Sequence, residues 1–200
     1  MRHPQRAIAA LLLAAGPLLV AAATVRVTVV NGAGSLLSDA VVLLEPLGAK
    51  VAPRPVSGLE VSQRDKQFQP RVAVVPVGSA VDFPNRDTVK HHVYSFSEAK
   101  RFEIKLYVGR PEKPVVFDRP GIVVLGCNIH DSMLGWIVVT DTPWHGRSGP
   151  DGQVTLAQVP AGSYRLRTWH PVLPAGSGGL EQALNVGGDA ELTVRLGGPP

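Results

Sequence analysis

The chain has 200 residues, of which 44% are hydrophobic, and it carries 20 Lys and Arg against 16 Asp and Glu. Two of the basic residues, Arg2 and Arg6, precede an apolar N-terminal stretch, and without them 18 basic residues face 16 acidic ones. The remaining charges are dispersed, whereas nucleic-acid-binding proteins gather Lys and Arg on one face. We therefore expect no nucleic acid as a partner. The length of the chain is sufficient for one or two domains.

Residues 1–23 have the pattern of a secretory signal peptide. Basic residues precede an apolar run at 7–20, and Ala21-Ala22-Ala23 is similar to a cleavage site. Gly16-Pro17 interrupts the run, whereas a membrane-spanning helix needs about 20 apolar residues, so an uncleaved anchor is the weaker alternative. We therefore expect a periplasmic or otherwise extracytoplasmic protein that has no stable membrane insertion after signal cleavage.

Short Val-rich runs recur along the chain, and Gly, Pro and Asp residues separate them. Such runs between turn signals indicate β-strands, which we expect at 24–30, 40–45, 72–76, 80–83, 115–117, 121–125 and 136–140. The first two should form a hairpin-like pair around the Asn31-Gly32-Ala33-Gly34 turn. No long amphipathic helix is evident, so the sequence predicts an all-β sandwich architecture.

Two adjacent histidines, His91 and His92, lie in a strand-like stretch of the middle segment. Successive side chains of a strand point to opposite faces. One of the two therefore points toward the interior and the other away from it, and the sequence leaves open which is which.

Cys127 is the single cysteine of the chain, and His130 and Met133 follow it at three-residue intervals. Exported proteins normally pair their cysteines, so an odd one needs another role. A small buried residue is one possibility, with Met133 as a gap filler. A thiolate, an imidazole and a thioether together suit copper, provided that a second imidazole comes from another strand. His145 and His170 have no such neighbours, and structural roles are expected for both.

The two ends of the chain share a further set of motifs. Residues 24–46 contain "SDAVVLLEP", and "DGQVTLAQVPAGSYRL" follows near the C-terminus. This pattern resembles the carboxypeptidase regulatory-like, transthyretin-like β-sandwich family. The resemblance implies a discontinuous second sandwich from 24–57 and 142–200, with 58–141 inserted, because exposed loops tolerate insertions. In the alternative, a tandem arrangement, the first strands join the middle domain.

The middle segment contains "FPNRDTVKHHV" and "VVFDRPGIVVLGCNIHDSMLGWIVV". Over residues 60–140 it resembles the cupredoxin family, of which plastocyanin and amicyanin are members, and more loosely exported proteins of the methylamine-utilisation type. The resemblance implies a cupredoxin-like Greek-key β-sandwich that binds one type 1 copper ion. It implies His91, Cys127, His130 and Met133 as ligands, with His92 as the alternative to His91, since cupredoxins commonly have Asn where His92 stands.

The expected function is single-electron transfer, and the resemblance implies His130 as the electron-conducting ligand beside an apolar patch that includes Leu134 and Trp136. A zinc site is disfavoured because a thioether is a poor zinc ligand. A hydrolase that uses Cys127 as its nucleophile would need an orienting group, and none is evident. A multicopper enzyme would need further histidine pairs, so we expect that the protein is not an enzyme. The implied partner is a c-type cytochrome or a periplasmic dehydrogenase. A copper carrier or sensor, and an interaction module with a copper clip, remain alternatives, and the second sandwich is expected to be a scaffold or docking surface.

Overall fold

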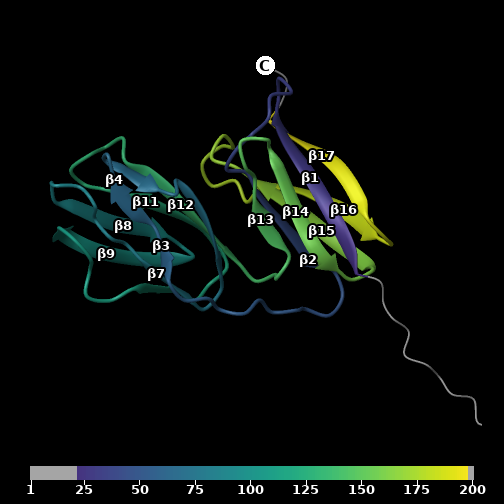
Figure 1. The fold of residues 1–200 in the computed structure, drawn as a ribbon, viewed down its shortest axis with the longest axis horizontal. Coiled ribbons are helices and arrows are strands. Elements are labelled where there is room, and N and C mark those ends of the chain that lie inside the picture. Colours follow the sequence, from purple (N-terminus) through teal and green to yellow (C-terminus); the bar gives the residue numbers. More distant parts are fainter. Residues whose placement is uncertain (1–21, 198–200) are drawn as a thin grey trace, which may run out of the picture.

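The computed structural model describes residues 22–197, and every regular element in that range is a β-strand (Figure 1). The all-β expectation is confirmed. The expected signal peptide falls on residues 1–23, of which 1–21 lie outside the described residues, and Ala23 is already the first residue of a strand. No helix long and apolar enough to cross a membrane occurs among residues 22–197.

Strands from the two ends of the described chain build one sandwich, here called the terminal sandwich. Its strands are β1 (Ala23–Asn31), β2 (Val41–Pro46), β13 (His145–Arg147), β14 (Gln153–Val159), β15 (Gly162–Trp169), β16 (Leu180–Val186) and β17 (Ala190–Leu196). One sheet has the order β14-β1-β17, and the other has the order β13-β2-β15-β16. β1 runs antiparallel to β14 and parallel to β17.

The first two strands therefore lie in different sheets, and the expected hairpin between them is wrong. β1 has a partner on each edge already, and β2 pairs with β13 and β15. Residues 32–40 are long enough to carry the chain across from one sheet to the other, whereas a hairpin needs a short loop. In this arrangement Val42 and Leu44 of β2 face β1 in one core cluster between the sheets, and Val41 and Leu43 on the other face of β2 are buried in a second cluster.

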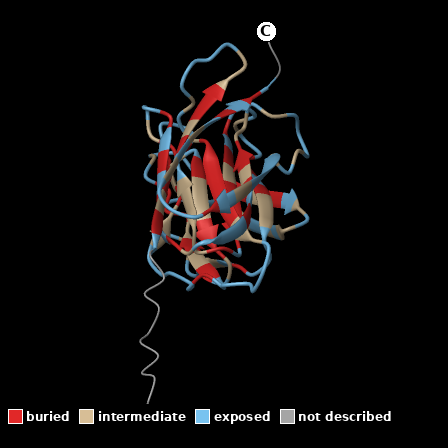
Figure 2. Cartoon of the chain, turned by 90° about the vertical axis from the view of Figure 1, so that its right-hand side faces the viewer, coloured by how far each residue is buried: buried red, intermediate tan, exposed pale blue. Residues whose placement is uncertain are grey.

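The core of the terminal sandwich follows from the period of two along its strands. Val25, Val27 and Val29 of β1 are fully buried, whereas Arg26 between them is exposed. They belong to one cluster with side chains of the facing sheet such as Leu44 and Leu166. Figure 2 shows buried segments along the strand interiors and exposed residues along the loops and edges.

Residues 59–140 build the middle sandwich. Its strands are β3 (Leu59–Glu60), β4 (Ser62–Arg64), β5 (Gln67–Gln69), β6 (Val72–Pro76), β7 (Ser79–Asp82), β8 (His91–Ser97), β9 (Lys100–Tyr107), β10 (Val115–Phe117), β11 (Gly121–Gly126) and β12 (Leu134–Thr140). A five-stranded sheet has the order β6-β12-β11-β8-β9 and faces a three-stranded sheet, β10-β7-β3, beside the hairpin β4-β5. Phe83, Phe102 and Phe117 pack between the sheets, with ring centroids 5.5 and 6.1 Å apart.

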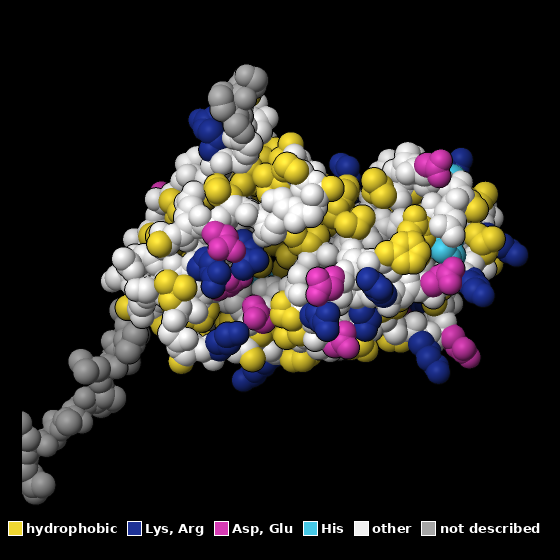
Figure 3. All heavy atoms as spheres, turned by 180° about the vertical axis from the view of Figure 1, so that it is seen from behind, with side chains coloured by type: hydrophobic (Ala, Val, Ile, Leu, Met, Phe, Trp, Pro, Cys, Tyr) yellow, Lys and Arg dark blue, Asp and Glu magenta, His cyan; other side chains and the backbone are white. Residues whose placement is uncertain are grey.

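The two sandwiches touch through a third, smaller apolar cluster. Val41 and Leu43 of β2, with Trp169 of β15, pack against Val72 and Val138 on the outer face of the five-stranded sheet. Beside this contact lies an open groove of about 940 Å³. In Figure 3, apolar side chains gather in the hollow between the two sandwiches, with charged side chains along its rim.

Candidate metal centre

The pairing of β8 with β11 brings two distant segments of the chain together at one end of the middle sandwich. β8 begins at His91, and β11 ends at Gly126, which pairs with Tyr94 of β8. Cys127 follows directly after β11, so its side chain lies next to the first residues of β8. The register of these two strands, rather than any local signal, places His91 beside Cys127.

The loop between β11 and β12 folds back on itself. The N–H of His130 donates to the carbonyl of Cys127 at 3.4 Å, and the N–H of Met133 donates to the carbonyl of His130 at 2.9 Å. These two hydrogen bonds hold the backbone of the loop in two successive turns. The loop thereby carries a thiol, an imidazole and a thioether within seven residues.

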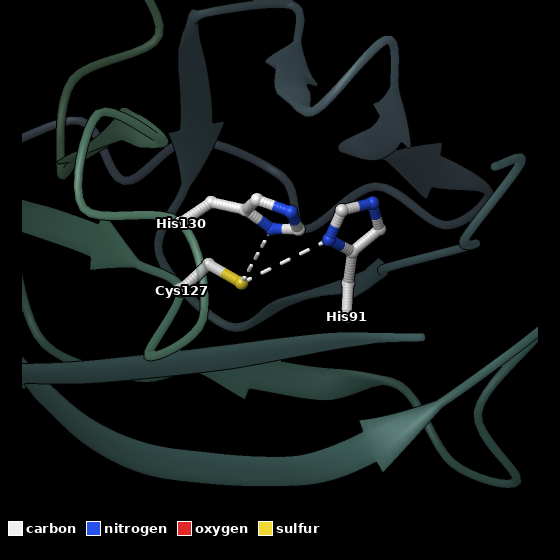
Figure 4. A group of neighbouring side chains, drawn as sticks. All are labelled: His91, Cys127 and His130. Atoms are coloured by element: carbon white, nitrogen blue, oxygen red, sulfur yellow. Dashed lines mark hydrogen bonds between the residues drawn. The ribbon is translucent and has the colours of Figure 1, made fainter. Parts of the chain in front are cut away.

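Three of the residues named from the sequence meet at this point (Figure 4). Nδ1 of His91 lies 3.8 Å from Sγ of Cys127, and Nδ1 of His130 lies 3.9 Å from it. The two imidazole rings have centroids 5.0 Å apart, and the three donor atoms lie within 4.8 Å of one another. Among the described residues this is the one such group of His, Cys, Asp and Glu.

These separations suit a metal ion at the centre of the group. Metal–nitrogen and metal–sulfur bonds of about 2.0 and 2.3 Å, as for zinc, give about 3.7 Å between nitrogen and sulfur when the angle at the metal is near 120°. The observed 3.8 and 3.9 Å lie close to that value. One sulfur and two imidazole nitrogens are also the trigonal donor set of mononuclear copper. The residues present therefore fit a copper ion in both their spacing and their donor atoms.

Met133 is the fourth residue named from the sequence. Its side chain is buried and belongs to the same core cluster as Cys127. The converging group itself consists of His91, Cys127 and His130. Met133 is the last residue of the loop, and its N–H donates to the carbonyl of His130.

His92 faces away from this group. Its Nε2 lies 2.9 Å from Oε1 of Glu103, its ring packs against Tyr94 at 5.4 Å, and its Nδ1 is buried with no hydrogen-bond partner. The structure thus brings His91, and not His92, to Cys127. His145 and His170 lie outside the group as well: Nδ1 of His145 lies 2.8 Å from the carbonyl of Thr142, and Nδ1 of His170 accepts the N–H of Val172.

Asp87 contacts the far side of His91, and sequence reasoning missed it. Its Oδ2 lies 2.7 Å from Nε2 of His91, and it also accepts the backbone N–H groups of Asp65 and Lys66. Burial by itself raises the pKa of Asp87, but the Lys66 N–H, the His91 ring and the Asp65 N–H together hold this pKa below its ordinary value. The one signal in the sequence is its position four residues before His91.

Asn85 and Tyr107 fix the loop that carries Asp87. Asn85 Nδ2 donates to the carbonyls of Val89 and Tyr107 at 2.8 Å each, and its Oδ1 accepts the N–H of Asp87. The Tyr107 hydroxyl donates to the carbonyl of Phe83 at 2.5 Å. Burial raises the pKa of Tyr107, and the nearby Cys127 adds to the rise. The loop before His91 is therefore held by hydrogen bonds from the side chains of Asn85 and Tyr107.

The surface around His130 differs in part from the expectation. His91 and Cys127 are buried, whereas His130 is half-buried, with Ile129 and Leu134 exposed near it in the sequence. Trp136 is not an exposed neighbour of His130: it packs against the cluster between the sandwiches, and the Arg71 guanidinium lies 5.0 Å from its ring centroid. The exposed apolar residues next to His130 in the sequence, Ile129 and Leu134, are aliphatic.

No protein-family model matches the chain, and no curated protein matches it. Among solved structures, a Cu-containing nitrite reductase from Thermus scotoductus is 26% identical, with 50% of this chain and 25% of that protein covered and a TM-score of 0.39. A purple cupredoxin from Nitrosopumilus maritimus is 21% identical over 40% of this chain and 96% of its own, with a TM-score of 0.35. A pseudoazurin from Hyphomicrobium denitrificans is 21% identical over 44% of this chain and 77% of its own, with a TM-score of 0.37.

The chain thus spans about a quarter of the reductase and most of the length of the two smaller proteins. Likenesses of this size assign no function to the chain. The three converging side chains have to carry that assignment.

Proposed function

We propose that this protein binds one copper ion of type 1 and carries single electrons between redox partners. His91 Nδ1, Cys127 Sγ and His130 Nδ1 are the proposed equatorial ligands, and the Met133 thioether is the proposed axial one. The observation that carries the proposal is the approach of two imidazole Nδ1 atoms to one buried, unpaired sulfur. Copper would supply a couple between Cu(II) and Cu(I) at this site.

The surroundings of the group favour electron transfer over carriage of the metal. Transfer of the ion requires ligands that can leave, whereas His91 and Cys127 are buried and the loop before His91 is fixed by Asn85. A site held in this way changes little between two oxidation states. Half-buried His130 is the ligand through which we expect electrons to leave, beside exposed Ile129 and Leu134.

A cysteine hydrolase is the second candidate, because the structure supplies the orienting group that the sequence did not reveal. Cys127, His91 and Asp87 form a row that has the composition of a catalytic triad. The burial of the row opposes this function: His91 is 0% and Cys127 4% exposed, so a substrate has no access to the sulfur. A second imidazole on the same sulfur has no role in such a mechanism, whereas it completes the copper ligand set.

The remaining assignments belong to the same proposal. The two units are residues 24–57 with 142–200, and residues 58–141. The protein is exported through a cleaved signal peptide, is not an enzyme, and exchanges electrons with a c-type cytochrome or a periplasmic dehydrogenase, in the manner of methylamine-utilisation proteins. The terminal sandwich is the proposed docking scaffold, because the groove that it lines together with the middle sandwich is also lined by Leu134, the residue that follows the ligand loop.

The visible spectrum of the protein with one equivalent of Cu(II) tests the proposal. A thiolate bound to Cu(II) gives intense blue or green colour, so the loaded protein should be coloured and Cys127→Ala should be colourless. His91→Gly should abolish the colour, and the matched variant His92→Gly should retain it. A colourless protein whose thiol still titrates freely after copper addition would refute the copper site.

A further inference from the structure

Two oxygens of Asp87 serve three N–H donors. Oδ1 lies 2.7 Å from the N–H nitrogen of Asp65, whereas Oδ2 lies 3.0 Å from that of Lys66 and 2.7 Å from Nε2 of His91. The side chain is only 14% exposed. An ionised carboxylate accepts on both oxygens and has no proton to donate. The two backbone N–H groups can only donate, so this arrangement of donors favours the ionised form of Asp87 over the protonated form.

The turn between β4 and β5 is built to supply two of those donors. Asp65 and Lys66 are its central residues, and both have positive φ, 54° and 58°. Left-handed backbone is unfavourable for residues other than glycine, and two such residues in succession form a two-residue hairpin turn. In this turn both backbone N–H groups point at the carboxylate, in the manner of an anion-binding nest.

The carboxylate in turn determines the tautomer of His91. Since Asp87 has no proton to give, the hydrogen bond at 2.7 Å requires the proton on Nε2. A neutral imidazole with its proton on Nε2 has a bare Nδ1, and Nδ1 is the atom that faces Cys127. The backbone turn, Asp87 and His91 thus form a chain that leaves a lone pair directed at the sulfur.

We propose that Asp87 is a positioning residue for the metal centre: it fixes His91 as an Nδ1 ligand and favours Cu(II) over Cu(I). The inference rests on the proposed copper function. A carboxylate behind a ligating histidine orients the ring and raises its basicity, and a more basic ligand with a negative charge behind it stabilises the higher oxidation state. His130 has no carboxylate partner among the described residues, so the two imidazoles are not equivalent.

The chain offers a matched control for this proposal. Glu103 lies behind His92 as Asp87 lies behind His91, at 2.9 Å and 2.7 Å. Asp87→Asn and Glu103→Gln remove the same charge from two neighbouring carboxylate–imidazole pairs. Only the first pair touches a proposed ligand.

The first experiment measures the reduction potential of both copper-loaded variants against the parent protein. Asp87→Asn should raise the ratio of Cu(I) to Cu(II) affinity by about tenfold, a rise of about 59 mV for a one-electron couple. Glu103→Gln should give less than a third of that rise. Equal shifts in the two variants, or no shift in Asp87→Asn, would overturn the proposal.

The second experiment needs neither copper nor a variant, and it decides the matter where Asp87→Asn fails to fold. Nitrogen-15 NMR of the metal-free parent protein at pH 8 should show His91 with its proton on Nε2 and a bare Nδ1. A proton on Nδ1 would overturn the proposal whatever the copper experiments give. A protein that shows the expected tautomer but stays colourless with Cu(II) would refute the copper function and not the role of Asp87 toward His91.

Discussion

A single methyl group at Gly135 should destabilise the middle sandwich, because β12 passes very close to Phe68. A Cβ at Gly135 would lie 2.9 Å from Phe68 Cβ and 3.1 Å from both Cγ and Cδ2. Carbon atoms in contact prefer about 3.5–4.0 Å, so β12 and β5 have to separate by roughly 0.6 Å or more. Phe68 is 1% exposed, and its Cβ cannot rotate away because it is attached to the backbone of β5.

The expected magnitude follows from two opposing effects. Overpacking of a dense core destabilises by about 1–3 kcal/mol, whereas replacing glycine by alanine restricts the unfolded chain and returns about 0.4–1 kcal/mol. Gly135→Ala should therefore lower the free energy of unfolding by about 1–2 kcal/mol. Urea unfolding of the metal-free protein, followed by circular dichroism, measures this as a lower midpoint at unchanged slope.

Gly126→Ala is the matched control on the neighbouring strand. Its Cβ would lie 2.6 Å from Cζ and 2.7 Å from Oη of Tyr94, but these atoms end a half-buried side chain that can swing outward. The loss should be below about 1 kcal/mol and should vanish in a Tyr94→Ala background. A neutral Gly135→Ala, or a Gly126→Ala that loses as much as Gly135→Ala, would refute this account of the packing.

Three further predictions concern other parts of the molecule. Leu166→Ala should destabilise the terminal sandwich by about 2–5 kcal/mol in urea unfolding, because the side chain is 1% exposed, and the copper colour should persist below the transition. Burial lowers the pKa of His170, so below about pH 6.5 the unfolded chain takes up a proton more readily than the folded one. The melting temperature should fall as pH drops from 7 to 5, and less so in His170→Gln; equal falls would contradict the burial effect. Asp118→Asn should change stability by less than about 0.5 kcal/mol, because its ion pair with Lys100 is solvent-exposed on the carboxylate side, and a larger loss would show an interaction that the structure lacks.

The strands were predictable where apolar residues alternate or cluster. The runs expected at 115–117 and 121–125 correspond to Val115–Phe117 and Gly121–Gly126. β9 was missed, although its sequence KRFEIKLY alternates, because the charged residues on its outer face conceal the pattern. The short strands β3 to β5 were missed as well, since two or three residues carry no detectable period.

Local spacing also determined part of the candidate metal centre. Cys127, His130 and Met133 lie on one loop, so their proximity requires no long-range information. The sequence further required that one of two adjacent histidines point inward, because strand side chains alternate. It could not say which one, and it gave no role to Asp87.

Tertiary structure decided those two points through strand register. Pairing Gly126 with Tyr94 fixes the phase of β8 and turns His91 toward Cys127, while His92 meets Glu103. A shift of one residue would exchange the two histidines. The position of the Asp87 carboxylate depends on the β4–β5 turn, which is distant in sequence and supplies two backbone N–H donors to it. The sequence by itself determined which chemical groups are available; contacts between segments far apart in the chain determined which of them meet, because strand pairing is specified by packing of both faces and not by local propensity.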